Sequence, residues 1–505
     1  MSITYWIAID KNDNGDFTNL GESITADILE AKWYLGMSEP DDTVADVGQA
    51  TVIVRNHQQQ FSPDITTNLI GKAFRIQSDD GNTIRTHFSG FVQRIIPQAG
   101  NQGTKLATII AYSRDYTLRQ NTIQLPLLLN LRADEAIHAI IDQAQWRYAF
   151  FEGYCIIGRD SIGSSDIFPD DAFARHFDTG ISEFEFIGDD WSDGYPAHRA
   201  IQQFTEGEDG RFFFDREGRA TFYNRHHLLN NPAIAATLTD DISDMVYHYG
   251  DVTNHITIQL KPRRVGDLHS ILWSLEQPIR LEVNTRIEVI ARYNIDGEAV
   301  GATAIDTPLQ AYTDYQAMDN AQQQDMTTFA SVTLLEIGSS ATTFEIANQA
   351  TRPIYLTQLI LRGTPLILGD PLTLSQSIPD SIVLYGKHTK QVDVPVISDI
   401  EDAIGLANWA LQRQAYPRGY VREITTTTRT HPTETLALTL YDLIAISEQQ
   451  TGHHETYAII REAHVVDKGG TRHRVTWLLE AADVDFFFTI GTHTIGDTSV
   501  VLVPR

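Results

Sequence analysis

The apolar positions of this chain follow a two-residue period in its first quarter. Residues 50–56, 72–78 and 86–97 are runs rich in β-branched and aromatic side chains, separated by glycine-containing turn sequences such as 78–82. Alternation of this kind, bounded by turns, is typical of half-buried β-strands. We therefore predict a strand-rich domain at the beginning of the chain.

Three later segments carry a helical period instead. In residues 132–147, alanine and isoleucine recur every three or four positions, and a shorter stripe of the same kind follows Pro196. A third stripe lies in residues 399–415, where Ser398 and Glu401 have the spacing of a capping box at the start of a helix. These three segments are predicted to be helices that each bury one face.

Two distant segments of the chain echo each other. Residues 89–115 and 456–483 both read as a strand, a turn ending in Gly-Thr-Lys or Gly-Thr-Arg, a second strand and a closing aspartate. The spacing from glycine to aspartate differs by one residue, which a β-bulge would absorb. Two interpretations stay open: a duplicated domain, or two unrelated hairpins. Residues 207–225 predict a further hairpin.

Together these patterns predict a mainly β protein with a minor helical part, of the α+β class. A chain of 505 residues is too long for one core, so several domains are expected. We place them at 1–125 (strand-rich), 126–235 (α+β), 236–296 and 366–485 (a second strand-rich domain, with helix 399–415), 297–365 (an inserted β-sandwich) and 486–505 (a C-terminal strand or tail).

The charge of the chain narrows its possible partners. Asp and Glu total 66 against 38 Lys and Arg, which gives a formal net charge of −28. Such a surface repels nucleic acid, so duplex binding is not expected. A wall past which DNA slides without adhering would carry the same charge. The single cysteine, Cys155, excludes an intrachain disulfide framework. No secretory signal and no membrane helix are expected from the sequence.

Residues 10–22 (DKNDNGDFTNLGE) resemble the beginning of a calcium loop. Asp10, Asn12 and Asn14 alternate as EF-hand ligands do, but the twelfth position is Gly21 instead of a glutamate. A strand also precedes the segment where a helix would be needed. We therefore interpret it as a turn between strands, with calcium binding as the alternative.

A group of histidines near the C-terminus offers a second metal hypothesis. His453, His454, His464 and His473 have no helical spacing, and adjacent residues of a strand face opposite sides. We expect these side chains to lie on the polar faces of a hairpin, with zinc binding as the alternative.

Catalytic motifs are few. The chain has no GxSxG, HExxH or phosphate-loop sequence, and Cys155 is expected to be a buried strand residue. Asp189, Asp190 and Asp193 lie beside Trp191, and carboxylates near an aromatic ring are what a glycosidase uses. Neighbouring carboxylates seldom face each other across a substrate, so we interpret them as an acidic loop. We assign no catalytic, cofactor-binding or metal-binding residue.

The order of several soft motifs resembles one family, the tail hub or baseplate hub (tail-tip) proteins of tailed bacteriophages. YWIAIDKNDNGDF, ESITADILEAKWYLG and GQATVIVRNHQQQFSP resemble the first tube-like barrel of such hubs, whose closing segment here is Asn56 to Pro63. ADEAIHAIIDQA and GRFFFDREGRATFYNR are similar to their middle domain. VTNHITIQLKPR resembles the entry to a second barrel, and YLTQLILRGTPL the return from an inserted sandwich.

The resemblance implies two tail-tube-like β-barrels, one near each end of the chain, and a structural, non-enzymatic role without a cofactor. It implies a homotrimer that closes the tail tube at the virion's tail tip, adapts symmetry and gates DNA. The implied partners are tail-tube, tape-measure and other tail-tip or fibre proteins, with genomic DNA only as passing cargo, no stable membrane insertion, and assembly in the host cytoplasm.

Two other functions remain as alternatives. The first is a glycan- or calcium-dependent adhesion or receptor-binding module of the virion, with the inserted sandwich as its binding face. The second is a glycan hydrolase that uses Asp189 and Asp190. The segment 486–505 alternates in a way that suits addition of a strand to a neighbouring sheet.

Overall fold

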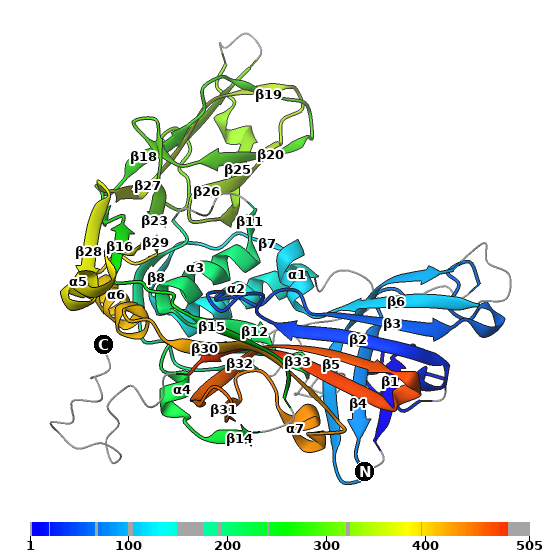
Figure 1. Ribbon diagram of the computed structural model, residues 1–505. Helices are drawn as coiled ribbons and strands as arrows, with labels where there is room; N and C mark the ends of the chain where they lie inside the picture. Colours follow the sequence, from blue (N-terminus) through cyan, green and yellow to red (C-terminus); the bar gives the residue numbers. More distant parts are fainter. Residues whose placement is uncertain are drawn as a thin grey trace.

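The computed structural model describes residues 3–19, 21–65, 69–98, 105–148, 175–189, 191, 194–239, 242–319, 324–394 and 396–482. The protein is mainly β with a small number of helices, as predicted (Figure 1). Strands from residues 4–112, 234–249 and 419–481 form one large sheet, a helical layer lies in the middle, and a separate β unit extends from it.

The first strand set contains the six N-terminal strands. Its spatial order is β1-β4-β5-β6-β3-β2. The predicted strands at 50–56, 72–78 and 86–97 are confirmed and are β3, β4 and β5 in chain order. Its elements are β1 (Thr4–Ile9), η1 (Thr25–Asp27), β2 (Ile28–Gly36), β3 (Gln49–Arg55), η2 (His57–Gln59), β4 (Ala73–Asp79), β5 (Ile84–Pro97) and β6 (Leu106–Tyr112).

The second strand set repeats this order with strands from residues 234–249 and 419–481. Its spatial order is β14-β31-β32-β33-β30-β15, so its strands in chain order occupy the same places as β1 to β6. One pair differs, because β14 runs parallel to β31 whereas β1 is antiparallel to β4. The elements are β14 (Ile234–Leu238), β15 (Ser243–Tyr249), β30 (Gly419–Thr427), α7 (Pro432–Ala437), β31 (Leu443–Glu448), β32 (His453–Asp467), η5 (Lys468–Gly470) and β33 (Arg472–Ala481).

The two echoing segments occupy equivalent hairpins of these sets. β5 and β6 pair with a register shift between Val92 and Arg94, and β32 and β33 pair with a shift between Ile459 and Arg461. The two bulges lie at the same place in the sequence echo. A shared strand order and a shared bulge support the duplication and not two unrelated hairpins. The closing Asp483 lies outside the described residues.

The two strand sets join edge to edge. β2 pairs antiparallel with β32 from Ala31↔Val466 to Gly36↔Arg461, which makes the sets one continuous twelve-stranded sheet. One hydrophobic core, with members such as Trp33, Val52, Ile459 and Trp477, spans both sets. We call the β2–β32 pairing the joint.

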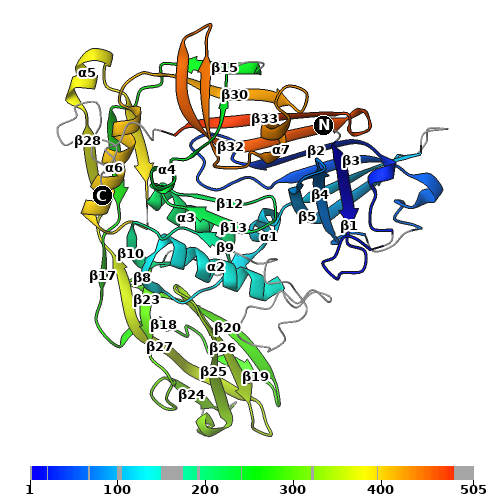
Figure 2. The same ribbon diagram turned by 90° about the horizontal axis from the view of Figure 1, so that it is seen from below.

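The middle unit lies between the two sets in sequence. Its predicted helices and the predicted hairpin at 207–225 are confirmed. Figure 2 shows α2 and α3 lying across the molecule between the strand sets and the outer β unit. The elements are α1 (Asp115–Gln120), β7 (Thr122–Ile123), β8 (Leu128–Arg132), α2 (Ala133–Tyr148), β9 (Arg175–Phe177), β10 (Glu183–Ile187), β11 (Tyr195–Pro196), α3 (Ala197–Glu208), β12 (Arg211–Phe214), β13 (Ala220–Tyr223) and α4 (His227–Asn230).

A long excursion separates β15 from β30. Its inner part packs on the middle unit through a shared core, and comprises β16 (His255–Leu260), β28 (Leu372–Ser377), α5 (Pro379–Tyr385), β29 (Thr389–Asp393) and α6 (Ile400–Gln414). The third predicted helix is therefore confirmed, but its cap is Asp399 and not Ser398. The Asp399 carboxylate accepts a hydrogen bond from the Glu401 N–H at 2.6 Å.

The outer part of the excursion is the β unit that extends away from the strand sets (Figure 1). Two sheets, β17-β27-β18 with β19, β23 and β24, and β20-β26-β25, enclose a separate hydrophobic core. The strands are β17 (Arg263–Val265), β18 (Ser270–Ser274), β19 (Ile279–Leu281), β20 (Arg286–Arg292), β21 (Asn294–Ile295), β22 (Glu298–Ala299), β23 (Gly301–Ile305), β24 (Tyr315–Met318), β25 (Ala330–Ile337), β26 (Ala341–Asn348) and β27 (Ile354–Leu368), with η4 (Thr327–Phe329).

The expected domain boundaries and the closed barrels stay predictions. Among the described residues, β1 and β2 do not pair with each other, and β2 continues into the second strand set instead. No helix within the described residues has the length and apolar character needed to cross a membrane.

Candidate interaction surfaces

The joint is built around one aromatic pair. Trp33 of β2 lies directly opposite His464 of β32, and their rings stack at a centroid distance of 4.9 Å and an angle of 7°. Both side chains are buried, although alternation alone places a histidine on either face of a strand. The joint therefore places a titratable ring where a strand–strand contact would ordinarily be apolar.

A buried ion pair fastens the middle unit to this joint. The Arg216 guanidinium, from the β12–β13 turn, donates to both carboxylate oxygens of Glu462 at 2.8 and 2.5 Å, and to the carbonyls of Leu436 and Leu438. Burial raises the pKa of Glu462, but the charge of Arg216 outweighs it and lowers that pKa to about 2. Glu462 is thus an anion whose charge is already neutralised at any physiological pH.

Among the open strand edges of the described residues, two belong to the strands that are equivalent to β2 and β32. β15 ends the sheet, so its outer edge has no paired strand. On the side of β5 that faces β4, pairing ends near Phe91, which leaves the edge of residues 94–97 open. Both edges display apolar side chains, since Tyr249 is 73% exposed and Ile96 is 44% exposed. Open edges with exposed apolar groups are sites where another strand can add.

A second surface is a charged cleft between the second strand set and α6. Its two adjoining parts have volumes of about 880 and 310 Å³ and share Asp41, Lys390, Arg413, Gln414 and Glu480. Lys390 lies 3.3 Å from Asp41, and Arg413 lies 3.0 Å from Glu480. Since these cations are already paired, the cleft offers no surplus positive charge to an anionic ligand.

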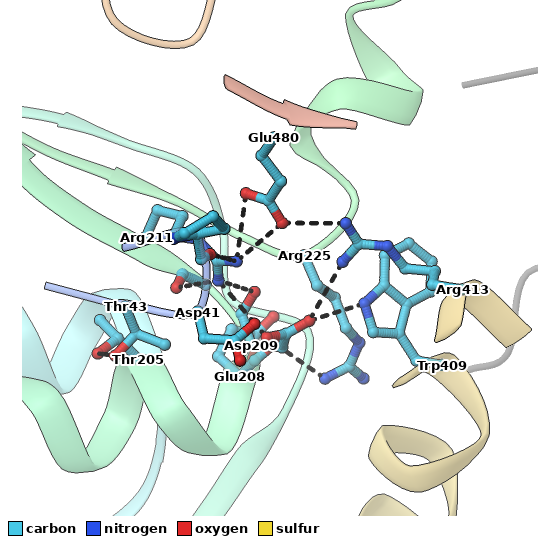
Figure 3. Close-up of polar contacts among 12 residues, drawn as sticks. Asp41, Thr43, Thr205, Glu208, Asp209, Arg211, Arg225, Trp409, Arg413 and Glu480 are labelled. Atoms are coloured by element: carbon cyan, nitrogen blue, oxygen red, sulfur yellow. Dashed lines mark hydrogen bonds and ion pairs between the residues drawn. The ribbon is translucent and has the colours of Figure 1, made fainter. Parts of the chain in front are cut away.

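Figure 3 shows how the wall of this cleft links four parts of the chain. Glu480 of β33 accepts from Arg211 of β12 at 3.2 Å and from Arg413 of α6 at 3.0 Å. Asp209, which follows α3, accepts from the Trp409 indole N–H at 2.8 Å. Burial raises the pKa of Asp209, but Arg211 and Arg413 outweigh it and lower that pKa. The network fixes the excursion against the strand sets and the middle unit.

In the acidic turn at residues 10–22, two carboxylates accept hydrogen bonds from the backbone of the turn itself. Asp10 is buried and accepts from the Asn14 and Gly15 N–H groups, and Glu22 accepts from the Lys11 and Asn19 N–H groups. The segment connects β1 to η1 and β2. The interpretation as a turn between strands is therefore confirmed.

The expectation for the C-terminal histidines is wrong in part. His454 is exposed, but His464 and His473 are 1% exposed and lie in the core, joined by a 2.8 Å hydrogen bond between His464 Nδ1 and His473 Nε2. Within the described residues, no three His, Cys, Asp or Glu side chains are placed to hold a metal ion. A local polar pattern missed His464 because its cross-strand neighbour, Trp33 of β2, is more than 400 positions away.

Asp189 is the acidic residue of GDDWSDG that the structure describes, and it is not exposed. Asp189 is 8% exposed and makes a bidentate ion pair with Arg263, at 2.6 and 2.9 Å, that ties the outer β unit to the middle unit. Trp191 is also buried, and its N–H donates to Gln203. Asp190, Asp193 and Cys155 lie outside the described residues. Asp189 is therefore occupied by a structural contact.

Sequence comparison gives no relatives: no family model matches the chain, and no curated protein does. The solved structures that it is similar to include tail proteins. A tail protein from Neisseria meningitidis MC58 has a TM-score of 0.48 at 7% identity and covers 94% of this chain and 96% of its own. The 43 kDa tail protein of prophage MuSo2 from Shewanella oneidensis has 0.49 at 10%, covering 96% and 99%. Prophage tail protein gp18 from Listeria monocytogenes EGD-e has 0.41 at 8%, covering 94% of each chain.

Proposed function

We propose that the protein is a structural hub of a phage tail tip or baseplate, in which three copies form a ring that closes the tail tube. The observation that carries the proposal is the duplicated strand order. Each chain supplies two equivalent six-stranded sets, so three chains supply six, which matches a tube of six-fold symmetry. The motif order that resembles tail hubs supports the same reading.

The joint within one chain indicates how copies would associate. In the duplication, β15 is equivalent to β2, and β5 is equivalent to β32. The equivalent of the β2–β32 pairing is therefore the open edge of β15 against the open edge of β5 from the next copy. The equivalent pairs put Tyr247 opposite Ile96 and Tyr249 opposite Arg94. A head-to-tail contact of this kind closes into a ring when its rotation divides the circle.

One difference between the edges would make this contact weaker than the joint. Pro97 stands where β32 has His464, and proline has no N–H to donate. The Gln98 N–H donates to Leu106 of β6, so the proline nitrogen is directed toward the open edge. The contact between copies would therefore have one hydrogen bond fewer than the joint. A weaker contact of this kind suits a ring that assembles at its tube, and it disfavours endless edge-to-edge growth.

The charge of the chain fits the proposed role. With a net charge of −28, a ring of three chains presents a repulsive wall to DNA, which lets the genome pass as cargo without adhering. We further propose that the ring contacts the tail tube, the tape-measure protein and other tail-tip proteins in the virion. The role is mechanical and requires no catalytic residue.

The test is the solution mass of the purified chain by light scattering after gel filtration, with negative-stain images of the same peak. We expect a mass of three chains and a ring with a central opening. Ile96→Lys or Tyr249→Lys would place a charge on an edge and give single chains. Ile84→Lys changes an exposed isoleucine of β5 whose edge is paired with β4, and it should still give three chains. A single chain at every concentration, with no ring in images of the wild type, contradicts the proposal.

A further inference from the structure

Three buried histidines gather at the joint, and we call them the histidine cluster: His87 of β5, His464 of β32 and His473 of β33. Each is 1% exposed or less. The ring centroids of His87 lie 5.8 Å from those of both His464 and His473, which are 5.1 Å apart. Trp33 lies within 6 Å of all three rings. The cluster therefore has members from both strand sets, on the two sides of the joint.

A chain of hydrogen bonds joins two of the three rings while both are neutral. The Tyr5 hydroxyl is hydrogen-bonded to His473 Nδ1 at 2.8 Å; when it donates there, His473 Nε2 can donate to His464 Nδ1 at 2.8 Å. His464 Nε2 lies 3.4 Å from the Glu462 carboxylate. A proton added to His464 Nδ1 would place two N–H donors, of His464 and of His473, against each other.

His87 is the weakest point of the arrangement. Its Nε2 is hydrogen-bonded to the Ser78 hydroxyl at 2.7 Å, and its Nδ1 has no hydrogen-bond partner in the described part of the chain. A proton on Nδ1 would therefore form a buried cation without an acceptor. Such a charge is costly because nothing nearby replaces the water that it loses.

The charged groups around the cluster oppose protonation. Arg216 from the β12–β13 turn and Arg85 from β5 are cations near His87, and burial together with these charges lowers its pKa well below the usual range. Tyr5 from β1 is neutral, because burial raises its pKa. The anion beside His464 is Glu462 from β32, and Arg216 already neutralises it. The pKa of His464 and that of His473 are lowered, in both cases chiefly by burial.

From this geometry we propose that the histidine cluster is an acid-sensitive latch: it keeps β2 paired with β32 while the three rings are neutral, and their protonation opens the joint. The latch acts within one chain, so it does not depend on association between copies. Above pH 7 the cluster is a packed, hydrogen-bonded contact. As the pH falls below the ordinary histidine pKa of about 6.5, the open form gains protons that the closed form excludes.

The size of the response follows from the number of protons. Each histidine that stays neutral when closed and protonates when open increases the opening constant about tenfold per pH unit below about pH 6. Three such residues give up to about a thousandfold between pH 6 and pH 5. The dependence ends where the closed form itself begins to bind protons.

The test is hydrogen–deuterium exchange read by mass spectrometry between pH 7.5 and pH 5, with rates corrected for the intrinsic effect of pH on exchange. Peptides that cover β2 and the C-terminal half of β32 should lose protection by more than tenfold between pH 6 and pH 5. Peptides of β3 and β6, which lie beyond β2 in the sheet, should keep theirs. If protection is unchanged at the joint, or is lost equally in all strands, the latch is wrong.

Variants assign the effect to the cluster. His87→Gln keeps a group able to bond Ser78 and removes one titrating ring, so it should reduce the pH response about tenfold per pH unit. His269→Gln replaces an exposed histidine of the outer β unit and should leave the response unchanged. If His87→Gln does not fold, the ring proton signals of the wild type decide by NMR. Cluster histidines that titrate near pH 6.5 while the joint stays closed would overturn the proposal.

Discussion

The contact between Arg216 and Glu462 makes a quantitative prediction about stability. Arg216→Ala leaves a fully buried carboxylate without its cation and removes the donor to two carbonyls. Breaking a buried ion pair by removing one partner costs about 3–5 kcal/mol, and each carbonyl that loses its donor adds about 1 kcal/mol. We therefore expect a loss of at least about 5 kcal/mol.

Urea denaturation followed by tryptophan fluorescence measures this loss, because Trp33 and Trp477 belong to the same core. With a slope of about 3 kcal/mol per molar urea, the midpoint should fall by more than about 1 M. Arg219→Ala is the matched control, since Arg219 lies in the same turn, is 43% exposed and pairs with Asp215. An exposed pair contributes about 1 kcal/mol or less, so the control should shift the midpoint by about 0.3 M or less.

A double variant separates charge from packing. Arg216→Met combined with Glu462→Leu removes both charges and keeps apolar volume, so it should recover at least half of the loss. If Arg216→Ala shifts the midpoint no more than Arg219→Ala does, then Arg216 does not stabilise the joint and the reasoning is refuted.

Three further predictions concern other contacts. Burial raises the pKa of Asp115 to about 7, so the contribution of this carboxyl to stability is full below pH 4 and is lost as the pH rises to 7. The free energy of unfolding of Asp115→Asn, relative to that of the wild type, should therefore rise by about 1 kcal/mol between pH 6 and pH 8. A difference in urea denaturation that does not change with pH contradicts this. Gly36→Ala should lower the melting temperature far more than Gly15→Ala, because both have positive φ but only at Gly36 would the methyl carbon lie 2.2 Å from the Ile460 carbonyl. Asp189→Asn removes the charge that pairs with Arg263, which should destabilise the contact of the outer β unit by about 3 kcal/mol. The outer β unit of the variant should then be cleaved at protease concentrations that leave the wild type intact. Equal cleavage of the two proteins excludes a stabilising role for Asp189.

Local patterns predicted the elements of this fold well. The helices that became α2, α3 and α6 have apolar residues at helical spacing, and the hairpin of β12 and β13 has a glycine turn between aromatic runs. Such signals depend on neighbours a few positions away. The cap of α6 moved by one residue, from Ser398 to Asp399, because both side chains can accept the hydrogen bond and local spacing does not choose between them.

The echo between the two ends of the chain was visible in the sequence, but its meaning was not. Two similar hairpins are expected by chance in a strand-rich chain. The strand order and the matching bulges after Val92 and Ile459 distinguish a duplication, and both are facts about pairing. The candidate surfaces depended on pairing as well, since an open edge such as that of β15 reads like any other alternating strand.

The sequence by itself determined the periods, the turns, the acidic surface and the repeated hairpin, because each depends on side chains that are close along the chain. Tertiary structure alone decided that β2 pairs with β32, so that His464 stacks on Trp33, and that Arg216 of a turn reaches Glu462. Strand pairing is governed by hydrogen bonds and burial between residues hundreds of positions apart, and a local polar pattern does not reveal which strands will pair or which face will be buried.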